Sequence, residues 1–164
     1  MSHFFVRTRA RSAFLALSFA LGVATPLGAQ SPADVAVVVH SGVPIDNMTI
    51  AELRHIVLGE REYWPASMRV TLLVGAEGSH ERAAMLKDIC QMTEDQFRQH
   101  WIAKMFRADT AVRPRSILTN DEAVNVASQT PGAIAFVDAS KVGKNLKVLK
   151  IDGKTPGQKG YALN

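Results

Sequence analysis

The sequence predicts an α/β fold, a three-layer sandwich in which helices cover both faces of a mixed, largely parallel sheet. Apolar runs at residues 35–39 and 133–137 are typical of strands that are buried on both faces. Between them, segments with helical spacing of apolar residues alternate with further short apolar runs. This β-α-β-α-α-β-α-β-β order is typical of a sheet packed between helices.

The predicted helices each begin at a side chain that can accept a hydrogen bond from the backbone N–H groups of the first turn. Thr49 and Thr93 are each followed three residues later by Glu or Gln, which completes a capping box. Gly59 is placed to end the first helix. The predicted caps are Thr49, Ser79, Thr93 and Asn120.

The predicted strands are short apolar runs bounded by turn residues. The last of them has alternating lysines, which is typical of an edge strand. The segment from residue 153 onward contains Gly, Pro and Lys, and we expect it to contribute little to the core. The strands are residues 35–39, 69–74, 114–118, 133–137 and 146–151.

The helix that follows Thr93 carries large apolar residues at helical spacing. We expect them to lie in the core rather than to form a surface on which a ligand stacks. They are Phe97, Trp101, Ile102, Met105 and Phe106.

Residues 1–29 have the layout of a secretory signal peptide. Three arginines form a basic start, an apolar run follows at residues 13–23, and small residues end at Ala29. The apolar run is shorter than the roughly 20 residues that span a bilayer, so a retained membrane anchor is the weaker alternative. Cleavage after Ala29 leaves residues 30–164 as one periplasmic domain with no membrane span, and cleavage after Ala24 is the alternative.

Composition excludes several function classes. The chain has 19 basic and 15 acidic residues and a net charge of +4. Three of the basic residues lie in the predicted signal peptide, so the remaining domain is nearly neutral and nucleic acid is not an expected partner. Six lysines follow residue 140 against one acid, Asp152. We interpret them as a solvated tail, with a docking strip for an acidic partner or a membrane surface as the alternative.

Little in the sequence points to catalysis or to a bound metal. Cys90 is the only cysteine, so no intramolecular disulfide and no Cys-based metal or redox motif is available, and we expect it in the core. The histidines show no metal-ligand spacing, and no cofactor is expected. No nucleophile elbow or hydrolase arrangement is present, so the chain is not expected to be an enzyme.

Ligands of α/β folds bind beyond the carboxyl ends of strands, where loops lead into helices. Three loops qualify, at residues 41–42, 75–79 and 119–120. In the second loop, Ser79 and the free N–H groups of the following helix can donate to an oxyanion, and Arg82 can add positive charge. The alternative is that Ser79 is an ordinary helix cap.

Two segments resemble the periplasmic phosphate-binding proteins of ABC transporters. The first, ELRHIVLGEREYWPASMRVTLLVGAEGSHER, begins at Glu52, and the second, TNDEAVNVASQTPGAIAFVD, begins at Thr119. That family shows a helix ending in an LGK-like turn, a Trp, a strand and an R-x-D-G-S-G-T loop, and later a helix followed by PGAIGYV. The resemblance implies a type II periplasmic-binding-protein-like fold, of which residues 30–164 supply a single lobe.

The family's phosphate loop is only partly kept in this chain. Gly78 and Ser79 match it, whereas Gly75 stands at the position of its Arg and Glu81 at that of its Thr. The strongest oxyanion partner is therefore lost, and Glu81 can repel an anion. The residues that the helix mouths and the resemblance assign to ligand binding are Gly78, Ser79, His80, Arg82, Thr119 and Asn120.

We therefore expect an exported solute-binding-type protein that binds phosphate or a related oxyanion and is linked to an ABC transporter. The alternative is an envelope protein-interaction module that keeps the lobe fold but has lost phosphate binding. The absence of an Arg at Gly75 favours this alternative, or a ligand other than free phosphate.

Overall fold

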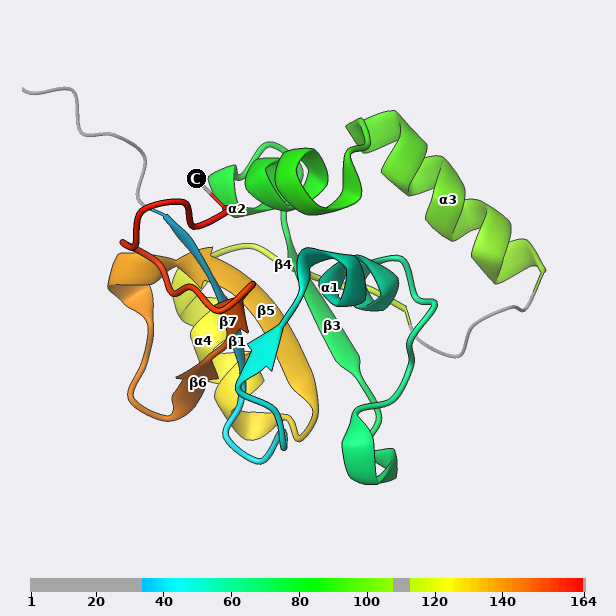
Figure 1. The fold of residues 1–164 in the computed structure, drawn as a ribbon. Coiled ribbons are helices and arrows are strands. Elements are labelled where there is room, and N and C mark those ends of the chain that lie inside the picture. Colours follow the sequence, from blue (N-terminus) through cyan, green and yellow to red (C-terminus); the bar gives the residue numbers. More distant parts are fainter. Residues whose placement is uncertain (1–33, 108–112, 164) are drawn as a thin grey trace, which may run out of the picture.

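A five-stranded sheet with helices on both faces forms the centre of the computed structural model, which describes residues 34–107 and 113–163 (Figure 1). The strands are β1 (Val35–His40), β2 (Asn47–Met48), β3 (Thr71–Gly75), β4 (Arg115–Ile117), β5 (Ala133–Asp138), β6 (Leu146–Val148) and β7 (Lys150–Ile151). The α-helices are α1 (Ile50–Val57), α2 (His80–Ala84), α3 (Glu94–Phe106) and α4 (Asn120–Gln129). Short 3-10 helices cover Pro65–Ser67 and Ala139–Lys141, and a π-helix at Met85–Cys90 continues α2.

The main sheet has the strand order β4-β3-β5-β1-β6, and β2 and β7 form a separate parallel pair. Strand β3 runs parallel to β4 and β5, whereas β1 is antiparallel to β5 and β6. The predicted mixed sheet is confirmed. Because β1 runs opposite to β3, β4 and β5, its carboxyl end lies at the same end of the sheet as their amino ends. The loop at residues 41–42, one of the three that qualified from the sequence, therefore lies at the opposite end of the sheet from the other two.

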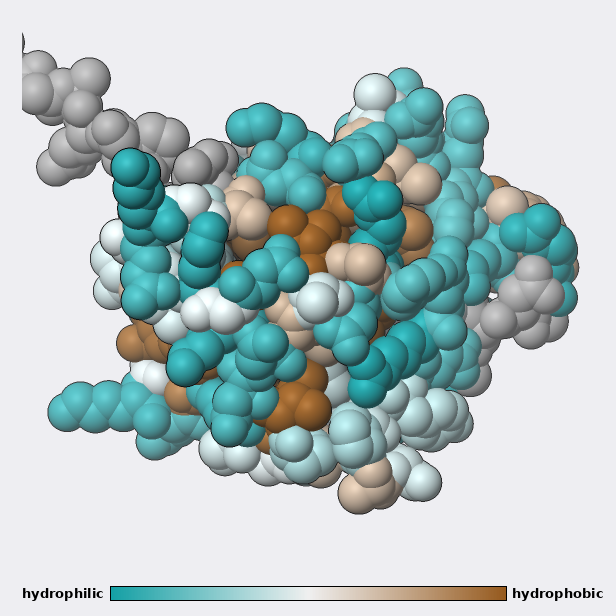
Figure 2. Space-filling model, in the orientation of Figure 1, coloured by the Kyte–Doolittle hydropathy of each residue, from teal (hydrophilic) through white to brown (hydrophobic). Residues whose placement is uncertain are grey.

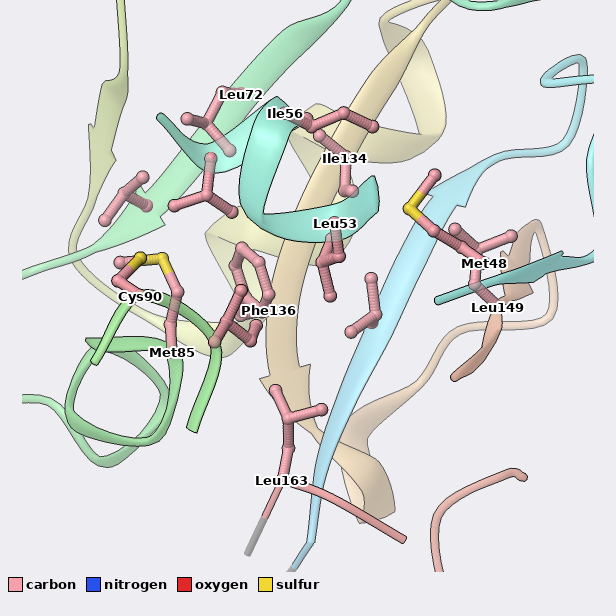
Figure 3. Packing of buried hydrophobic residues seen from close by; sticks show 14 of the residues in the cluster. Met48, Leu53, Ile56, Leu72, Met85, Cys90, Ile134, Phe136, Leu149 and Leu163 are labelled. Atoms are coloured by element: carbon pink, nitrogen blue, oxygen red, sulfur yellow. The ribbon is translucent and has the colours of Figure 1, made fainter. Parts of the chain in front are cut away.

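Strand β1 is buried on both faces, as its run of valines predicts. Val35, Val37 and Val39 pack in the cluster that includes α1, α2 and the π-helix, part of which is shown in Figure 3. Ala36 and Val38 pack in the second cluster, under α4. Full burial of a valine side chain contributes about 1.5–3 kcal/mol, so this strand alone anchors the sheet strongly between its two layers.

The predicted capping boxes of α1 and α3 are confirmed. In α1, the Glu52 backbone N–H donates to the Thr49 hydroxyl at 3.2 Å, and the Thr49 backbone N–H donates to the Glu52 carboxylate at 2.8 Å. Thr93 and Gln96 make the same reciprocal pair at the start of α3. The helix predicted over residues 80–90 also has the expected extent, and it ends at Gln91, whose φ of 54° is left-handed.

The two segments that carried the family resemblance contact each other directly. The indole Nε1 of Trp64 donates to the backbone carbonyl of Gly132 at 2.8 Å, and the bond is buried. Gly132 has a φ of +77°, and a Cβ there would lie 2.0 Å from the carbonyl oxygen of Arg69. Only glycine fits this position, and the contact holds the start of β5 against the start of β3.

Helix α3 buries less than its sequence predicts. Phe97 and Trp101 lie in the core, but Ile102, Met105 and Phe106 are exposed, so their assignment to the core is wrong. The helix extends away from the sheet (Figure 1), and within the described ranges none of its residues beyond Trp101 is buried.

The C-terminal segment is more ordered than predicted. Tyr161 and Leu163 are buried, the Tyr161 hydroxyl donates to the Val35 carbonyl at 2.8 Å, and the Val35 N–H donates to the Leu163 carbonyl at 3.1 Å. The expectation of little core there is wrong, because composition does not report which few apolar residues fold back. The strand predicted at residues 146–151 is divided at Leu149 into the edge strand β6 and the separate strand β7.

The surface agrees with this arrangement. Figure 2 shows a mostly hydrophilic face on which hydrophobic residues are visible only in patches. Among the described residues, none of the helices has the length and apolar character that crossing a membrane requires.

Candidate functional site

A small cavity of about 70 Å³ lies at the carboxyl ends of β3 and β4. By this measure a single water needs about 10–15 Å³, so the space admits a small polar group. Two of the three predicted loops, at residues 75–79 and 119–120, meet here. The lining residues are Leu73, Gly75, Ala76, Ser79, Glu81, Ile117, Leu118, Thr119, Asn120, Ala123 and Phe136.

Two helix N-termini meet at this cavity. Ser79 caps α2, and its hydroxyl accepts a hydrogen bond from the Arg82 backbone N–H at 3.2 Å. Thr119 caps α4 in the same way and accepts from the Glu122 N–H at 3.1 Å. The predicted cap of this helix, Asn120, is instead its first residue. Since the first N–H groups of a helix have no partner within it, both ends direct donors and positive dipole ends toward the cavity region.

Glycines shape the first of these loops. Gly78 has a φ of +81° and lies at the exposed tip, and it does not line the cavity. Gly75 does line it, and a Cβ at Gly75 would lie 2.5 Å from the Ser79 hydroxyl oxygen. The absence of a side chain at Gly75 therefore makes room for the cap of α2.

Arg82 is not brought into the cavity. Its guanidinium forms a salt bridge with both carboxylate oxygens of Glu94 in α3, and it also donates to the Gly75 carbonyl at 3.0 Å. It lies 5.5 Å from the centre of the Phe97 ring, and the side chain is only 12% exposed. Sequence reasoning missed Glu94, which is 12 positions away and is brought close only by the packing of α3.

Glu81 lines the cavity in which a ligand would lie. The Asn120 side-chain amide donates to the Glu81 carboxylate at 2.7 Å, and the Asn120 side-chain oxygen accepts from the Asp138 N–H at 2.9 Å. Asn120 thus ties α2 to the end of β5. Among the described residues that line the cavity there is one carboxylate and no Lys or Arg.

Asp138 and His80 lie near the cavity without lining it. Hydrogen bonds from the Ser140 hydroxyl and backbone N–H hold the pKa of Asp138 below its ordinary value, and the charges of Lys141 and His80 act in the same direction. Within the described ranges, no group of three His, Cys, Asp or Glu side chains is placed to hold a metal ion.

Of the six residues predicted to bind a ligand, three line the cavity, namely Ser79, Thr119 and Asn120. Gly78, His80 and Arg82 do not. Glu81 was noted from the sequence only as a source of repulsion. The sequence does hold a signal for its place in the cavity wall. Glu81 follows Gly78 by three residues and is the second residue of the predicted helix, and side chains at such positions lie near the helix N-terminus.

Comparison with protein-family models gives no match. Solved structures with a similar fold are a phosphate ABC transporter substrate-binding protein with bound phosphate from Clostridium perfringens (15% identity, TM-score 0.66), an ABC-type phosphate transport receptor from Vibrio cholerae (15%, 0.61) and PstS from Borrelia burgdorferi (17%, 0.62).

These matches cover 80%, 76% and 80% of this chain and 52%, 48% and 54% of the three neighbours, in the same order. The chain thus spans about half the length of the proteins that it matches. Its described residues form a single α/β lobe, and that lobe is similar in fold to phosphate ABC transporter substrate-binding proteins.

Proposed function

We propose that this chain is an exported solute-binding protein that works with an ABC transporter and binds a small oxyanion in the cavity at the ends of β3 and β4. The observation that carries this proposal is the meeting of two helix caps, Ser79 and Thr119, at one small cavity. Helix N-termini favour negative groups through their free N–H donors and their dipole. The fold similarity to phosphate transport proteins supports the same function.

The carboxylate of Glu81 restricts the ligand class. A unit negative charge about 4 Å away costs on the order of 1 kcal/mol in water and about 4 kcal/mol near a protein surface. An oxyanion that carries a proton can instead donate a hydrogen bond to Glu81, because Asn120 uses only part of the acceptor capacity of that carboxylate. Hydrogen phosphate meets this requirement, whereas sulfate and molybdate are fully ionised at neutral pH.

Isothermal titration of the purified full-length chain with phosphate, sulfate and molybdate tests this proposal. We expect heat with phosphate and weaker heat with the other two anions. Thermal unfolding provides a second measure, since a ligand at 100 times its Kd stabilises a protein by about 2.7 kcal/mol. If none of the three anions gives heat or a shift at millimolar concentration, oxyanion binding is wrong.

A second candidate function is an envelope protein-interaction module that no longer binds phosphate. The cavity lining without Lys or Arg favours it. Bidentate pairing with Arg gives the strongest oxyanion contacts, and helix N-termini alone contribute only about 0.3–2 kcal/mol each. No response to the three anions, together with a normally folded protein, would favour this second function.

Export is tested by the mature N-terminus. The chain is expressed with its own N-terminal segment in a Gram-negative host. We expect it in the periplasmic fraction, with the mass of a product whose first residue is Gln30. A product that begins at Thr25 would move the cleavage to Ala24. An uncleaved chain in the membrane fraction would contradict the signal-peptide prediction.

A further inference from the structure

An apolar groove of about 290 Å³ lies between α3 and the edge strand β4. It is a different space from the small cavity, and the two have no lining residue in common. One wall comes from α3 and the other from the start of β4. The lining residues are Val74, Arg82, Phe97, Arg98, Trp101, Ile102, Met105, Arg113, Pro114 and Ser116.

The wall from α3 is rigid at its base and apolar at its rim. Phe97 and Trp101 are buried, and their rings meet edge to face with centres 6.3 Å apart. Beyond them, Ile102, Met105 and Phe106 are 41%, 43% and 88% exposed. Three of the five large apolar side chains that are exposed in the described parts of the chain thus lie within five positions of one helix.

Arginines are the charged residues among the described residues that line the groove, and there are three of them. Arg82 and Arg98 have intramolecular partners, Glu94 and Asp95. Arg113 on the β4 side is exposed, and the structure gives it no salt bridge within the described ranges. A segment in this groove would have α3 apolar side chains on one flank and the guanidinium of Arg113 on the other.

We infer that this groove docks a segment of a partner protein that carries apolar anchors along one side and a carboxylate on the other, where it meets Arg113. Helix-in-groove recognition uses apolar anchors of this kind, and complementary charge fixes orientation and excludes the wrong partners. The interaction does not depend on whether the cavity binds an oxyanion.

The size of the patch favours a peptide segment over a second copy of this chain. A stable protein interface needs about 800 Å² from each partner. A fully buried aromatic side chain accounts for about 150–250 Å². Phe106, which does not line the groove but follows Met105 on the same helix, thus supplies a few hundred together with the exposed parts of Ile102 and Met105. That area suits two or three anchors of one segment.

Selection from a displayed library of random peptides of about 12 residues tests the inference without assuming a partner. The full-length chain serves as bait, and the double variant I102D/F106D serves for counter-selection. We expect enriched peptides that combine aromatic or aliphatic anchors with Asp or Glu and that bind the double variant at least about tenfold more weakly. The Tyr63→Asp variant is the matched control, because Tyr63 is a large exposed side chain outside the groove, and it should bind like the wild type.

The best peptide, synthesised and measured by fluorescence anisotropy, then tests the charge. Arg113→Glu should weaken binding about five- to tenfold, and added salt should weaken it further, whereas Lys144→Glu, an exposed charge reversal outside the groove, should not. Three results would overturn the inference. They are the absence of enrichment, enriched peptides that are basic or that bind the double variant equally, and self-association in sedimentation that I102D/F106D abolishes.

Discussion

The cavity and the groove use the same two strands but have opposite chemistry. Leu73 and Gly75 of β3 line the cavity, and Val74 between them lines the groove. In β4, Ile117 lines the cavity and its neighbour Ser116 lines the groove. Successive side chains of a strand point to opposite faces, so the pleat itself assigns neighbouring residues to two different sites.

Helix α2 separates the charges between these sites. Glu81 lines the cavity, whereas Arg82, the next residue, lines the groove. Consecutive helical residues point about 100° apart, so adjacent positions can serve different surfaces. The comparison shows that a basic residue beside an anion-binding motif in sequence need not belong to that motif in space.

The largest expected effect concerns the sheet on which both sites are built, at the contact between the starts of β5 and β3. Gly132→Ala should destabilise the protein by at least about 3 kcal/mol, because the positive φ costs about 1–2 kcal/mol and the Cβ would meet the Arg69 carbonyl at 2.0 Å. Urea unfolding measures it. Gly153→Ala is the control, since its φ of +78° is the same but nothing lies within 4 Å of the added Cβ. Equal losses in both variants would show that the clash is relieved without cost.

The second prediction concerns the link between the two sites. Arg82→Ala should cost about 2–3 kcal/mol, because it leaves Glu94 without its partner and frees the Gly75 carbonyl. The cost should stay below that of a fully buried pair, since Glu94 is 32% exposed. Arg98→Ala, which breaks the exposed pair with Asp95, should cost less than about 0.5 kcal/mol.

The same variant tests whether Arg82 contacts the ligand. Because its guanidinium is directed to α3, the oxyanion affinity of Arg82→Ala should change by less than about threefold under conditions where the variant is folded. If a folded Arg82→Ala protein lost all phosphate binding, Arg82 would contact the ligand. That result would contradict the separation of charges described above.

The third prediction concerns the chemistry of the cavity wall. Glu81→Gln removes the negative charge and should raise sulfate affinity about tenfold while changing phosphate affinity less, because only sulfate lacks a proton to share with the carboxylate. Titration calorimetry with both anions measures the ratio. Glu77→Gln removes an exposed charge of the same loop outside the cavity and should leave that ratio unchanged. An unchanged ratio in Glu81→Gln would show that Glu81 does not face the ligand.

Much of the fold could be predicted from local signals. The runs at β1 and β5 and the capping boxes at Thr49 and Thr93 each specify an element through neighbouring residues alone. The direction of β1 could not be predicted, because alternation and composition are the same in either direction. The orientation of Arg82 depends on Glu94 in another helix, and the burial of Tyr161 depends on a carbonyl of the first strand. Each of these three features depends on contacts between residues that are distant in the sequence.

The smallest expected effect lies at the rim of the cavity, where Asp138 ends β5. Because Ser140 donates two hydrogen bonds to it, the pKa of Asp138 in the folded protein is below its ordinary value. Its contribution is therefore present above the pKa that the carboxyl has in the unfolded chain, and it is lost as the pH falls through the folded-state pKa.

Asp138→Asn should accordingly lower stability by about 0.5 kcal/mol near neutral pH and by less in acid, since in acid the wild-type carboxyl is itself protonated. Urea unfolding at both pH values measures the difference. Ser140→Ala should reproduce part of the loss, because it removes the hydroxyl donor and keeps the backbone donor. The Asp138 backbone N–H also holds Asn120, so this turn supports the side chain that fixes Glu81. If the loss in Asp138→Asn is the same at both pH values, the ionised carboxylate does not stabilise this rim.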